Sequence, residues 1–210
     1  MNNEQNMAIQ TLPIGIQIPE SINNLKLPDR TLLNYYILRE NRCFFIDYEI
    51  DDNITDIQQE IMLINMVDDD NDIPIEKRAP IKLYIHSPGG DLIRTYSLCN
   101  TIINSKTPVW TYNYGDAYST AFLILIAGHK RFAMPFSTAM LHTGSGETGG
   151  TYEQTMEQAK IYKKQIDYMG KYILQQTKID EKTYKKNKNK AWYLAAEEQT
   201  KYRIVDEIGL

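Results

Sequence analysis

Cysteine and histidine are scarce in this sequence, and no long hydrophobic run interrupts it. The 210 residues include two cysteines and three histidines. Cys43 and Cys99 lie in apolar or mixed segments without metal-like spacing, which favours two reduced core thiols over a single disulfide. The longest apolar run, residues 121–127, is far shorter than a membrane span, and residues 1–20 lack the basic and apolar regions of a signal peptide. We therefore expect a cytoplasmic protein with no membrane partner.

An excess of charge of one sign is also missing. The 23 basic and 27 acidic side chains give a formal net charge of -4, which does not indicate a general nucleic-acid surface. Hydrophobic residues make up 42% of the chain and charged residues 24%, an ordinary globular composition. A chain of this size can bury roughly 70% of its unfolded surface without disulfides. We expect one domain with its own core.

One acidic run has the composition, but not the spacing, of a cation site. Its members are Asp68, Asp69, Asp70 and Asp72. They lack the spaced ligands and the glycine of a calcium loop, so a solvated turn is favoured. We therefore expect neither a metal nor another cofactor.

The N-terminal segment differs from the rest of the chain. Residues 1–30 are polar and carry Pro13, Pro19 and Pro28 without a sustained hydrophobic period, which is typical of an arm rather than a packed element. The sequence therefore divides into an N-terminal arm, residues 1–30, and a folded body, residues 31–210.

The body alternates between strand and helix patterns. Aromatic and β-branched residues predict strands at 43–50, 81–87, 109–112 and 137–143, and apolar spacing predicts helices at 57–67, 92–103 and 120–128. Residues 115–119 read as a turn. Three successive strand–turn–helix units predict an α/β fold with a largely parallel sheet and helices on its faces.

Residues 151–176 carry the clearest helical pattern in the chain. Thr151 and Gln154 predict a capping box at its start. An apolar stripe then follows one face, formed by Met156, Ala159, Tyr162, Ile166, Met169 and Ile173. Two interpretations remain open: the stripe packs on the chain's own core, or the helix projects and docks on a neighbouring subunit.

Candidate catalytic residues gather at turns that follow strands. Ser119 lies at a strand-to-helix turn, where a serine is more often a helix N-cap but where its hydroxyl could also serve as a nucleophile. His142 ends a strand, and the turn at 89–90 offers two glycine amides. His86 also ends a strand, whereas His129 lies in a basic turn and should be exposed. Ser119, His142 and the glycine turn should therefore project at the same edge of the sheet, and they are the minimum set for acyl transfer.

Four motifs, in this order and spacing, resemble the Clp protease proteolytic subunit (ClpP) family. They are SPGGD at 87–91, GDAYSTAFLILIAG at 115–128, KRFAMPFSTAMLH at 130–142 and WYLAAEEQTKYRIVDEIG at 192–209. The resemblance covers roughly residues 31–210. It implies a crotonase-like α/β spiral of ββα units, two stacked heptameric rings around a chamber, and a projecting handle helix, here about residues 143–176.

The resemblance also assigns roles to single residues. It implies that Ser119 is the nucleophile, that His142 is the general base, and that the backbone N–H groups of Gly90 and Thr120 form the oxyanion hole. The segment 144–150 is similar to the family's strand beside the cleft, which implies that polypeptide substrates bind there as an added β-strand.

The sequence departs from the family at the third member of the catalytic triad. Counting back from YLAA places the family's aspartate at Ala191. Loss of the acid in a serine triad costs about 10⁴ in turnover, so we expect a slow peptidase. Three explanations stay open: Asn187 or Asn189 substitutes through its amide oxygen, Asp180 supplies a carboxylate, or the chain is only weakly active.

Two further departures concern partners. A basic run stands where the family carries acid–base pairs between rings, so a single heptamer is an alternative to two stacked ones; its members are Lys178, Lys182, Lys185, Lys186, Lys188 and Lys190. Because Asp180 and Glu181 dilute its charge, the run does not indicate nucleic-acid binding. Tyr84 and Phe132 match aromatic residues that bind loops of an AAA+ unfoldase, but Lys82 and Asn104 are polar where apolar residues are expected.

The sequence therefore predicts a serine endopeptidase that cleaves unfolded proteins or peptides inside a homo-oligomeric chamber. Its core would act without ATP, and larger substrates would need delivery by a partner. A noncatalytic ClpP-like subunit of a mixed ring, or of a capsid-associated assembly, is the alternative. A crotonase-type acyl-CoA enzyme shares the fold, but it would not require both Ser119 and His142.

Overall fold

The computed structural model describes residues 30–146 and 149–209, and it divides the chain into two units, residues 1–41 and 42–210. In the first unit the described element is helix α1 (Arg30–Glu40). The predicted boundary between arm and body falls inside this helix, and the rest of the predicted arm lies outside the described residues. The second unit contains the sheet and the remaining described helices.

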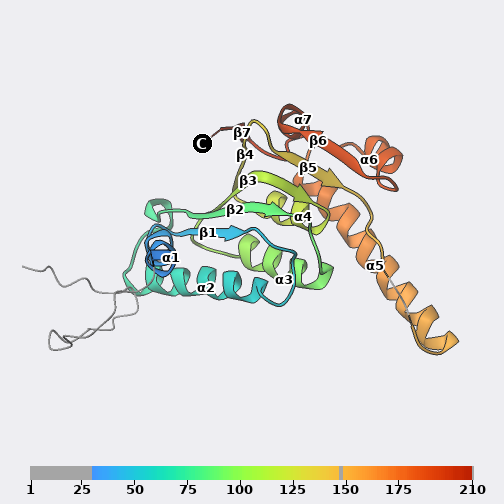
Figure 1. The fold of residues 1–210 in the computed structure, drawn as a ribbon, viewed down its shortest axis with the longest axis horizontal. Helices are drawn as coiled ribbons and strands as arrows, with labels where there is room; N and C mark the ends of the chain where they lie inside the picture. Colours follow the sequence, from blue (N-terminus) through green and yellow to red (C-terminus); the bar gives the residue numbers. More distant parts are fainter. Residues whose placement is uncertain (1–29, 147–148, 210) are drawn as a thin grey trace, which may run out of the picture. The chain divides into compact units, whose positions relative to one another are not determined.

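A mostly parallel sheet forms the centre of the second unit (Figure 1). Its main path runs β1 (Cys43–Ile46), β2 (Ile81–Ser87), β3 (Val109–Tyr118), β4 (Lys130–Ala133) and β7 (Glu207–Ile208), with every neighbouring pair parallel. Strand β5 (Thr138–Leu141) pairs parallel with β3, and β6 (Trp192–Ala195) pairs antiparallel with β5. This arrangement confirms the predicted α/β class.

Four helices lie where the sequence pattern predicts them: α2 (Ile54–Asp70), α3 (Leu92–Ile103), α4 (Thr120–Ala127) and α5 (Tyr152–Gln176). The structure adds α6 (Glu181–Asn187), α7 (Ala196–Lys201) and a 3₁₀ turn at Ile75–Lys77. Every residue of α4 is buried, which explains why its sequence is apolar all round. Within the described residues, no helix is long and apolar enough to cross a membrane, and no disulfide joins the two cysteines.

Two predictions at the centre of the sheet were wrong. The predicted turn at 115–119 is mostly strand, because β3 leaves β4 after Asn113 and pairs with β5 from Asp116 to Tyr118. Glycine is present at position 115 because His86 packs closely against it, not because the chain turns there: a Cβ would lie 2.5 Å from Nδ1 of His86. Strand β4 was missed, because its basic residues resembled an exposed turn. Arg131 is nevertheless buried and donates to the carbonyl of Gln176 at 2.8 Å.

A buried pair of amides lies where β3 changes partners. Asn113 donates through Nδ2 to Oε1 of Gln199 at 3.0 Å and to the carbonyl of Thr138 at 3.1 Å. Gln199 in turn donates to the carbonyl of Leu194 at 3.0 Å. Because these bonds join β3 to the start of β5, to β6 and to α7, they hold in place the strand that leads to His142.

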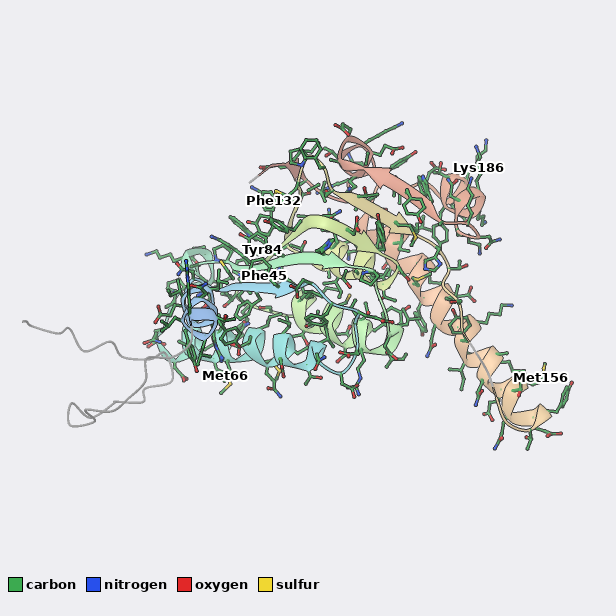
Figure 2. The ribbon with its side chains drawn as sticks, viewed as in Figure 1. Phe45, Met66, Tyr84, Phe132, Met156 and Lys186 are labelled. Atoms are coloured by element: carbon green, nitrogen blue, oxygen red, sulfur yellow. The ribbon has the colours of Figure 1, made fainter. Side chains whose placement is uncertain are left out.

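The apolar stripe of α5 packs on the chain's own core at one end and is exposed at the other. The capping box is confirmed, with Gln154 N–H donating to Thr151 Oγ1 and Thr151 N–H donating to Gln154 Oε1. Met169 and Ile173 pack in the core, whereas Met156 is exposed near the far end of the helix (Figure 2). The C-terminal part of the stripe therefore packs on this chain, and the N-terminal part is left uncovered by it.

The solvated turn predicted for the acidic run is confirmed only in part: Asp69, Asp70 and Asp72 are exposed and Asp72 lies in a turn, but the run begins inside α2. Asp68 is fully buried, and its Oδ2 accepts hydrogen bonds from Arg42 Nη1 at 2.8 Å and from Thr107 Oγ1 at 2.7 Å. The hydrogen bond from Arg42 holds the pKa of Asp68 below its ordinary value. The prediction failed for Asp68 because Arg42 and Thr107 are far away in sequence. Asp68 thus joins the start of β1, the end of α2 and the segment before β3.

Replacing Asp68 with asparagine should lower the free energy of unfolding by about 3 kcal/mol at pH 7, because the Arg42 charge loses its buried partner. The native pKa of Asp68 is depressed, so its stabilisation is complete above the unfolded pKa of about 4 and is lost as the pH falls through the native value. Urea denaturation of both chains should therefore show the difference shrinking below about pH 4. Exposed Asp70→Asn is the control, with an expected change within about 0.5 kcal/mol. A constant difference down to pH 2 would contradict the ion-pair explanation.

Candidate active site

Ser119 occupies a strained junction between β3 and α4. Its backbone has φ 54° and ψ -118°, a conformation that residues other than glycine rarely adopt. The Ser119 N–H donates to the carbonyl of Met140 at 2.9 Å, and the Ser119 carbonyl accepts from Phe122 N–H at 3.2 Å. These bonds hold the abrupt change of direction from strand to helix and place the hydroxyl at the carboxyl end of β3.

His142 reaches this hydroxyl from the end of the neighbouring strand. Its Nε2 lies 2.7 Å from Oγ of Ser119, a hydrogen-bond distance. The register of β3 and β5 accounts for the approach, because Tyr118 pairs with Met140 and places both strand ends side by side. The two candidates that the sequence placed at one sheet edge are therefore in contact.

The glycine turn packs directly against the serine. A Cβ on Gly89 would lie 2.8 Å from the Ser119 Cβ and 2.9 Å from the Thr120 nitrogen. Gly90 approaches Ile50 as closely, since a Cβ on Gly90 would lie 2.2 Å from the Ile50 oxygen. Two backbone bonds of 2.8 Å fix this contact, Ile50 N–H to the Gly89 carbonyl and Asp91 N–H to the Ile50 carbonyl. Only glycine fits at either position.

Two backbone amides beside the Ser119 hydroxyl are available to a ligand. Within the described chain, the N–H groups of Gly90 and Thr120 form none of the backbone hydrogen bonds found outside regular helices and strands. Thr120 is also the first residue of α4, and the first N–H groups of a helix have no partner within the helix. Such N–H groups stabilise an oxyanion when they are held rigidly. The close packing of Gly89 on Thr120 supplies that rigidity.

These groups line a cleft of about 630 Å³. Its walls come from the glycine turn, the Ser119 turn, the segment after β5 and helix α5; among the lining residues are Gly90, Ser119, Thr120, His142, Gly144 and Ser145. From α5 the cleft receives Tyr162, Ile166 and Met169. The sequence did not assign these three to the cleft, although they belong to the predicted stripe.

None of the three candidates for a third catalytic residue hydrogen-bonds to His142 within the described chain. Asn187 donates through Nδ2 to the carbonyl of Thr183 at 2.9 Å, and Asp180 caps α6 by accepting from Thr183 N–H at 2.9 Å. Asn189 is exposed. In the described chain, the side chain of His142 makes one protein hydrogen bond, through Nε2.

Ala191 and His142 both adjoin the last pair of the β5–β6 ladder. Strands β5 and β6 are antiparallel, and their last register pair is Leu141 with Trp192. His142 follows this last pair in the chain and Ala191 precedes it, and Thr143 N–H then donates to the carbonyl of Lys188 at 2.9 Å. Ala191 is the position at which the resemblance to the ClpP family places the aspartate of the triad.

The hydroxyl of Thr120 is buried without a hydrogen-bond partner in the described chain. Replacing Thr120 with valine removes that unsatisfied group and keeps the shape and the backbone N–H. We expect the free energy of unfolding to stay equal or rise by about 1 kcal/mol, and the reactivity of Ser119 to be retained. Chemical denaturation and labelling of Ser119 by a fluorophosphonate measure the two quantities. A strong loss of labelling in a folded variant would show that the hydroxyl takes part in the site.

A ladder of aromatic rings covers a different part of the sheet. Neighbouring ring centroids are 4.9 Å apart between Phe45 and Tyr84, 4.7 Å between Tyr84 and Tyr112, and 4.6 Å between Tyr112 and Phe132. The rings come from β1, β2, β3 and β4 in sheet order (Figure 2 labels Phe45, Tyr84 and Phe132). Tyr84 alternates with the core residues Leu83 and Ile85, so the ladder lies on the sheet face away from them.

The described residues contain no group of three or more His, Cys, Asp or Glu side chains that could hold a metal ion.

The lysines of the basic run that belong to α6 or follow it are partly or fully exposed, and Lys185 pairs with Glu181 at 2.7 Å (Lys186 is labelled in Figure 2).

The parallel sheet with its added β5–β6 pair, and the contact of a serine with a histidine at its edge, define a ClpP-like α/β protein. The family model for Clp protease matches residues 29–210, so the chain belongs to the Clp protease family. This confirms the resemblance read from the four motifs.

A curated relative comes from Arabidopsis thaliana. It is the "ATP-dependent Clp protease proteolytic subunit-related protein 2, chloroplastic", 29% identical over 174 residues. The match covers 81% of this chain and 60% of the relative, so the chain spans about three fifths of that protein's length.

Proposed function

We propose that this member of the Clp protease family is a serine endopeptidase that cleaves peptides and unfolded polypeptides. The observation that carries the proposal is the 2.7 Å contact between Ser119 Oγ and His142 Nε2. Ser119 is the proposed nucleophile and His142 the general base. The amides of Gly90 and Thr120 form the proposed oxyanion hole, and the reaction needs no cofactor.

The reaction follows from this geometry. His142 Nε2 accepts the proton of the Ser119 hydroxyl as Oγ attacks the carbonyl carbon of a peptide bond. The negative charge that develops on the carbonyl oxygen is stabilised by the N–H groups of Gly90 and Thr120. His142 then gives its proton to the leaving amine, which breaks the C–N bond and leaves an acyl ester on Ser119. Water, deprotonated by His142, hydrolyses that ester.

The substrate class follows from the shape of the cleft. The segment after β5 lies along the cleft, and Gly144 and Ser145 line it with backbone groups that can pair with an extended peptide. Main-chain pairing selects extended, unfolded chains rather than one sequence. A folded protein would not fit, so we propose cleavage inside a homo-oligomeric chamber built from a heptameric ring, single or stacked, in the cytoplasm.

The uncovered part of α5 supports this assembly. Met156 and Ile161 are exposed, although the capping box and the continuous helix hold them in an ordered element. A second copy of the chain would bury them. One end of the aromatic ladder supports an AAA+ unfoldase as partner, since Phe45 is exposed and Tyr84 partly exposed and could receive a loop of such a protein, whereas Tyr112 and Phe132 are buried.

Ala191 supports a second candidate function. Without a carboxylate at position 191, the imidazolium formed during the reaction lacks an ion-pair partner there. A noncatalytic subunit of a mixed ring or capsid-associated assembly would have this feature. It would form the assembly and leave Ser119 unreactive.

Covalent labelling separates the two functions. The purified, assembled chain is treated with a fluorophosphonate, and its intact mass is measured beside Ser119→Ala and His142→Ala chains. A peptidase gives one adduct in the parent chain that is absent from Ser119→Ala and strongly slowed in His142→Ala. An assembled parent chain that gives no adduct would overturn the proposed activity in favour of the noncatalytic subunit.

A further inference from the structure

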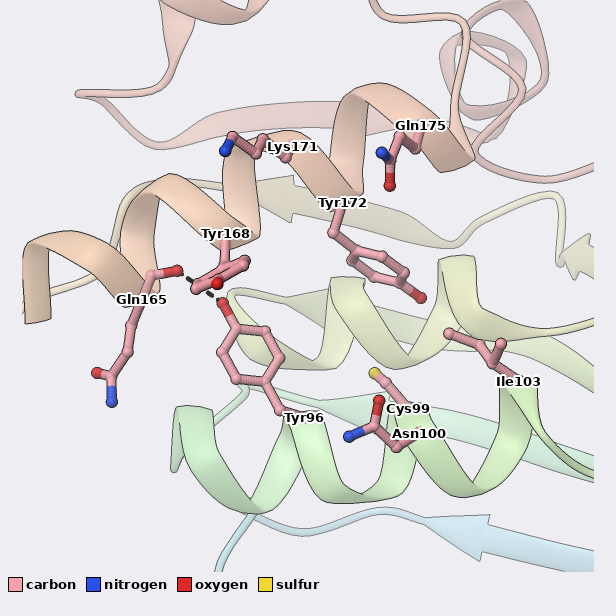
Figure 3. A pocket seen from close by; sticks show the side chains of 9 residues that line it. All are labelled: Tyr96, Cys99, Asn100, Ile103, Gln165, Tyr168, Lys171, Tyr172 and Gln175. Carbon is pink, nitrogen blue, oxygen red and sulfur yellow. Dashed lines mark hydrogen bonds between the residues drawn. The ribbon is translucent and has the colours of Figure 1, made fainter. Parts of the chain in front are cut away.

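A second cavity, outside the catalytic cleft, lies between α3 and the C-terminal part of α5 (Figure 3). Its volume is about 520 Å³, within the range of small-molecule sites. Helix α3 contributes Tyr96, Cys99, Asn100 and Ile103; helix α5 contributes Gln165, Tyr168, Lys171, Tyr172 and Gln175. None of these side chains belongs to the proposed catalytic machinery.

The lining combines an apolar interior with a single charge. Three tyrosine rings, Ile103 and the Cys99 thiol form the apolar surface, and burial raises the pKa of that thiol to about 12, so it stays neutral. Lys171 is the one charged residue in the lining. Its Nζ lies 5.9 Å from the Tyr168 ring centroid, and it forms no salt bridge within the described chain. A ligand that matches this lining carries an apolar body and one negative charge.

The cavity and the catalytic cleft share a wall. Gln165 lines both of them, and the residues of α5 around it, Tyr162, Ile166 and Met169, line the cleft. The hydroxyl of Tyr96 donates to the carbonyl of Gln165 at 2.8 Å, which joins α3 to α5 at this wall (Figure 3). A molecule between α3 and α5 would therefore act on the same helix that borders the Ser119–His142 pair.

We propose that the α3–α5 cavity binds a small monocarboxylic acid with an aromatic body, whose carboxylate pairs with Lys171 and whose ring stacks among Tyr96, Tyr168 and Tyr172. Binding holds α3 and α5 together and changes the reactivity of Ser119. The binding step is independent of the proposed peptidase function, and the effect on Ser119 rests on it.

The binding step is tested on Ser119→Ala protein with 3-phenylpropanoate as the probe, by isothermal titration and saturation-transfer NMR. Saturable binding is expected. Lys171→Gln should weaken it about three- to fivefold, as for an exposed ion pair, and Ile103→Trp, which fills the cavity from its exposed rim, should abolish it. Lys163→Gln, an exposed lysine of α5 outside the lining, is the matched control and should bind as the parent does.

Several outcomes would overturn the site. One is the absence of saturable binding; another is binding that Ile103→Trp leaves unchanged. Equal affinity for the neutral 3-phenylpropanamide would overturn the assignment of Lys171. Sedimentation is measured in parallel, and binding that disappears as copies associate would mean that a second copy, not a carboxylic acid, fills the cavity.

The effect on Ser119 is read in the parent chain as the rate of fluorophosphonate labelling against probe concentration. We expect at least a twofold change with the same midpoint as binding, and none in Ile103→Trp. A labelling rate that stays constant while the probe binds would overturn the coupling. A chain that binds the probe but is never labelled would overturn the peptidase function and leave the binding site standing.

Discussion

Replacing Ala191 with aspartate is expected to accelerate the labelling of Ser119 about 100-fold or more, within the 10⁴ that a triad carboxylate contributes. Residues 142 and 191 adjoin the last β5–β6 pair, Leu141 with Trp192, so we expect a side chain at position 191 to lie near His142. A carboxylate there would accept the Nδ1 proton of His142, hold the ring with Nε2 toward Ser119, and stabilise the imidazolium formed as Ser119 attacks. The measurement is the second-order rate constant of fluorophosphonate labelling, followed by hydrolysis of an unstructured peptide.

Two matched variants separate the parts of this effect. Ala191→Asn can orient the ring but carries no charge, so it should give a smaller increase than aspartate. Lys190→Asp places the same carboxylate one residue away and should leave the rate nearly unchanged. Equal rates for Ala191→Asp and the parent chain would show that position 191 does not reach Nδ1 of His142.

Replacing Gly90 with alanine should reduce labelling of Ser119 by about 10²–10³, the usual effect of losing one oxyanion donor. The new Cβ would lie 2.2 Å from the backbone oxygen of Ile50, and the φ of +152° is one that alanine rarely adopts. Since backbone cannot move aside as a flexible side chain can, the turn must shift and take its N–H away from the Ser119 hydroxyl. The same strain should also lower the free energy of unfolding by about 2–3 kcal/mol.

Gly149→Ala is the control for this experiment, because a Cβ there meets no atom within 4 Å. It should keep parent-like labelling and stability. Rates are expressed per folded chain, with the folded fraction taken from urea denaturation, so that destabilisation does not imitate lost chemistry. Parent-like labelling of folded Gly90→Ala would show that the Gly90 amide is not part of the proposed oxyanion hole.

Local sequence pattern predicted the elements in which apolar side chains face the core and polar side chains face solvent. The helix expected at 92–103 begins and ends at those residues, because its apolar spacing and the Asp91 cap act within a few residues. Strand β4 and the buried Asp68 were missed for the opposite reason. Arg131 and Asp68 are charged, and the groups that make their burial favourable, such as Asp206 and Arg42, lie far away in sequence.

The candidate site, too, was predicted from local pattern in part, and the rest depends on contacts between residues distant in sequence. Strand ends predicted that Ser119, His142 and the glycine turn would share one sheet edge. Their contact distance depends on the registers of β3 with β5 and of Ile50 with Gly90, which local pattern does not contain. The wall that α5 adds to the cleft was missed because its stripe could equally pack on the core or on another subunit. Motif spacing pointed to Ala191, and the structure places it directly before Trp192, the first residue of β6.

The backbone of Ser119 sets the stability of the chain against the chemistry proposed for it. A residue with a Cβ at φ 54° and ψ -118° costs about 1–3 kcal/mol that glycine would largely avoid. Random substitution with selection for stability alone would therefore favour glycine at this position. The conformation therefore fits the proposed nucleophile, since glycine would relieve the strain but cannot supply a hydroxyl, and the fold would carry the cost of the chemistry in a single residue.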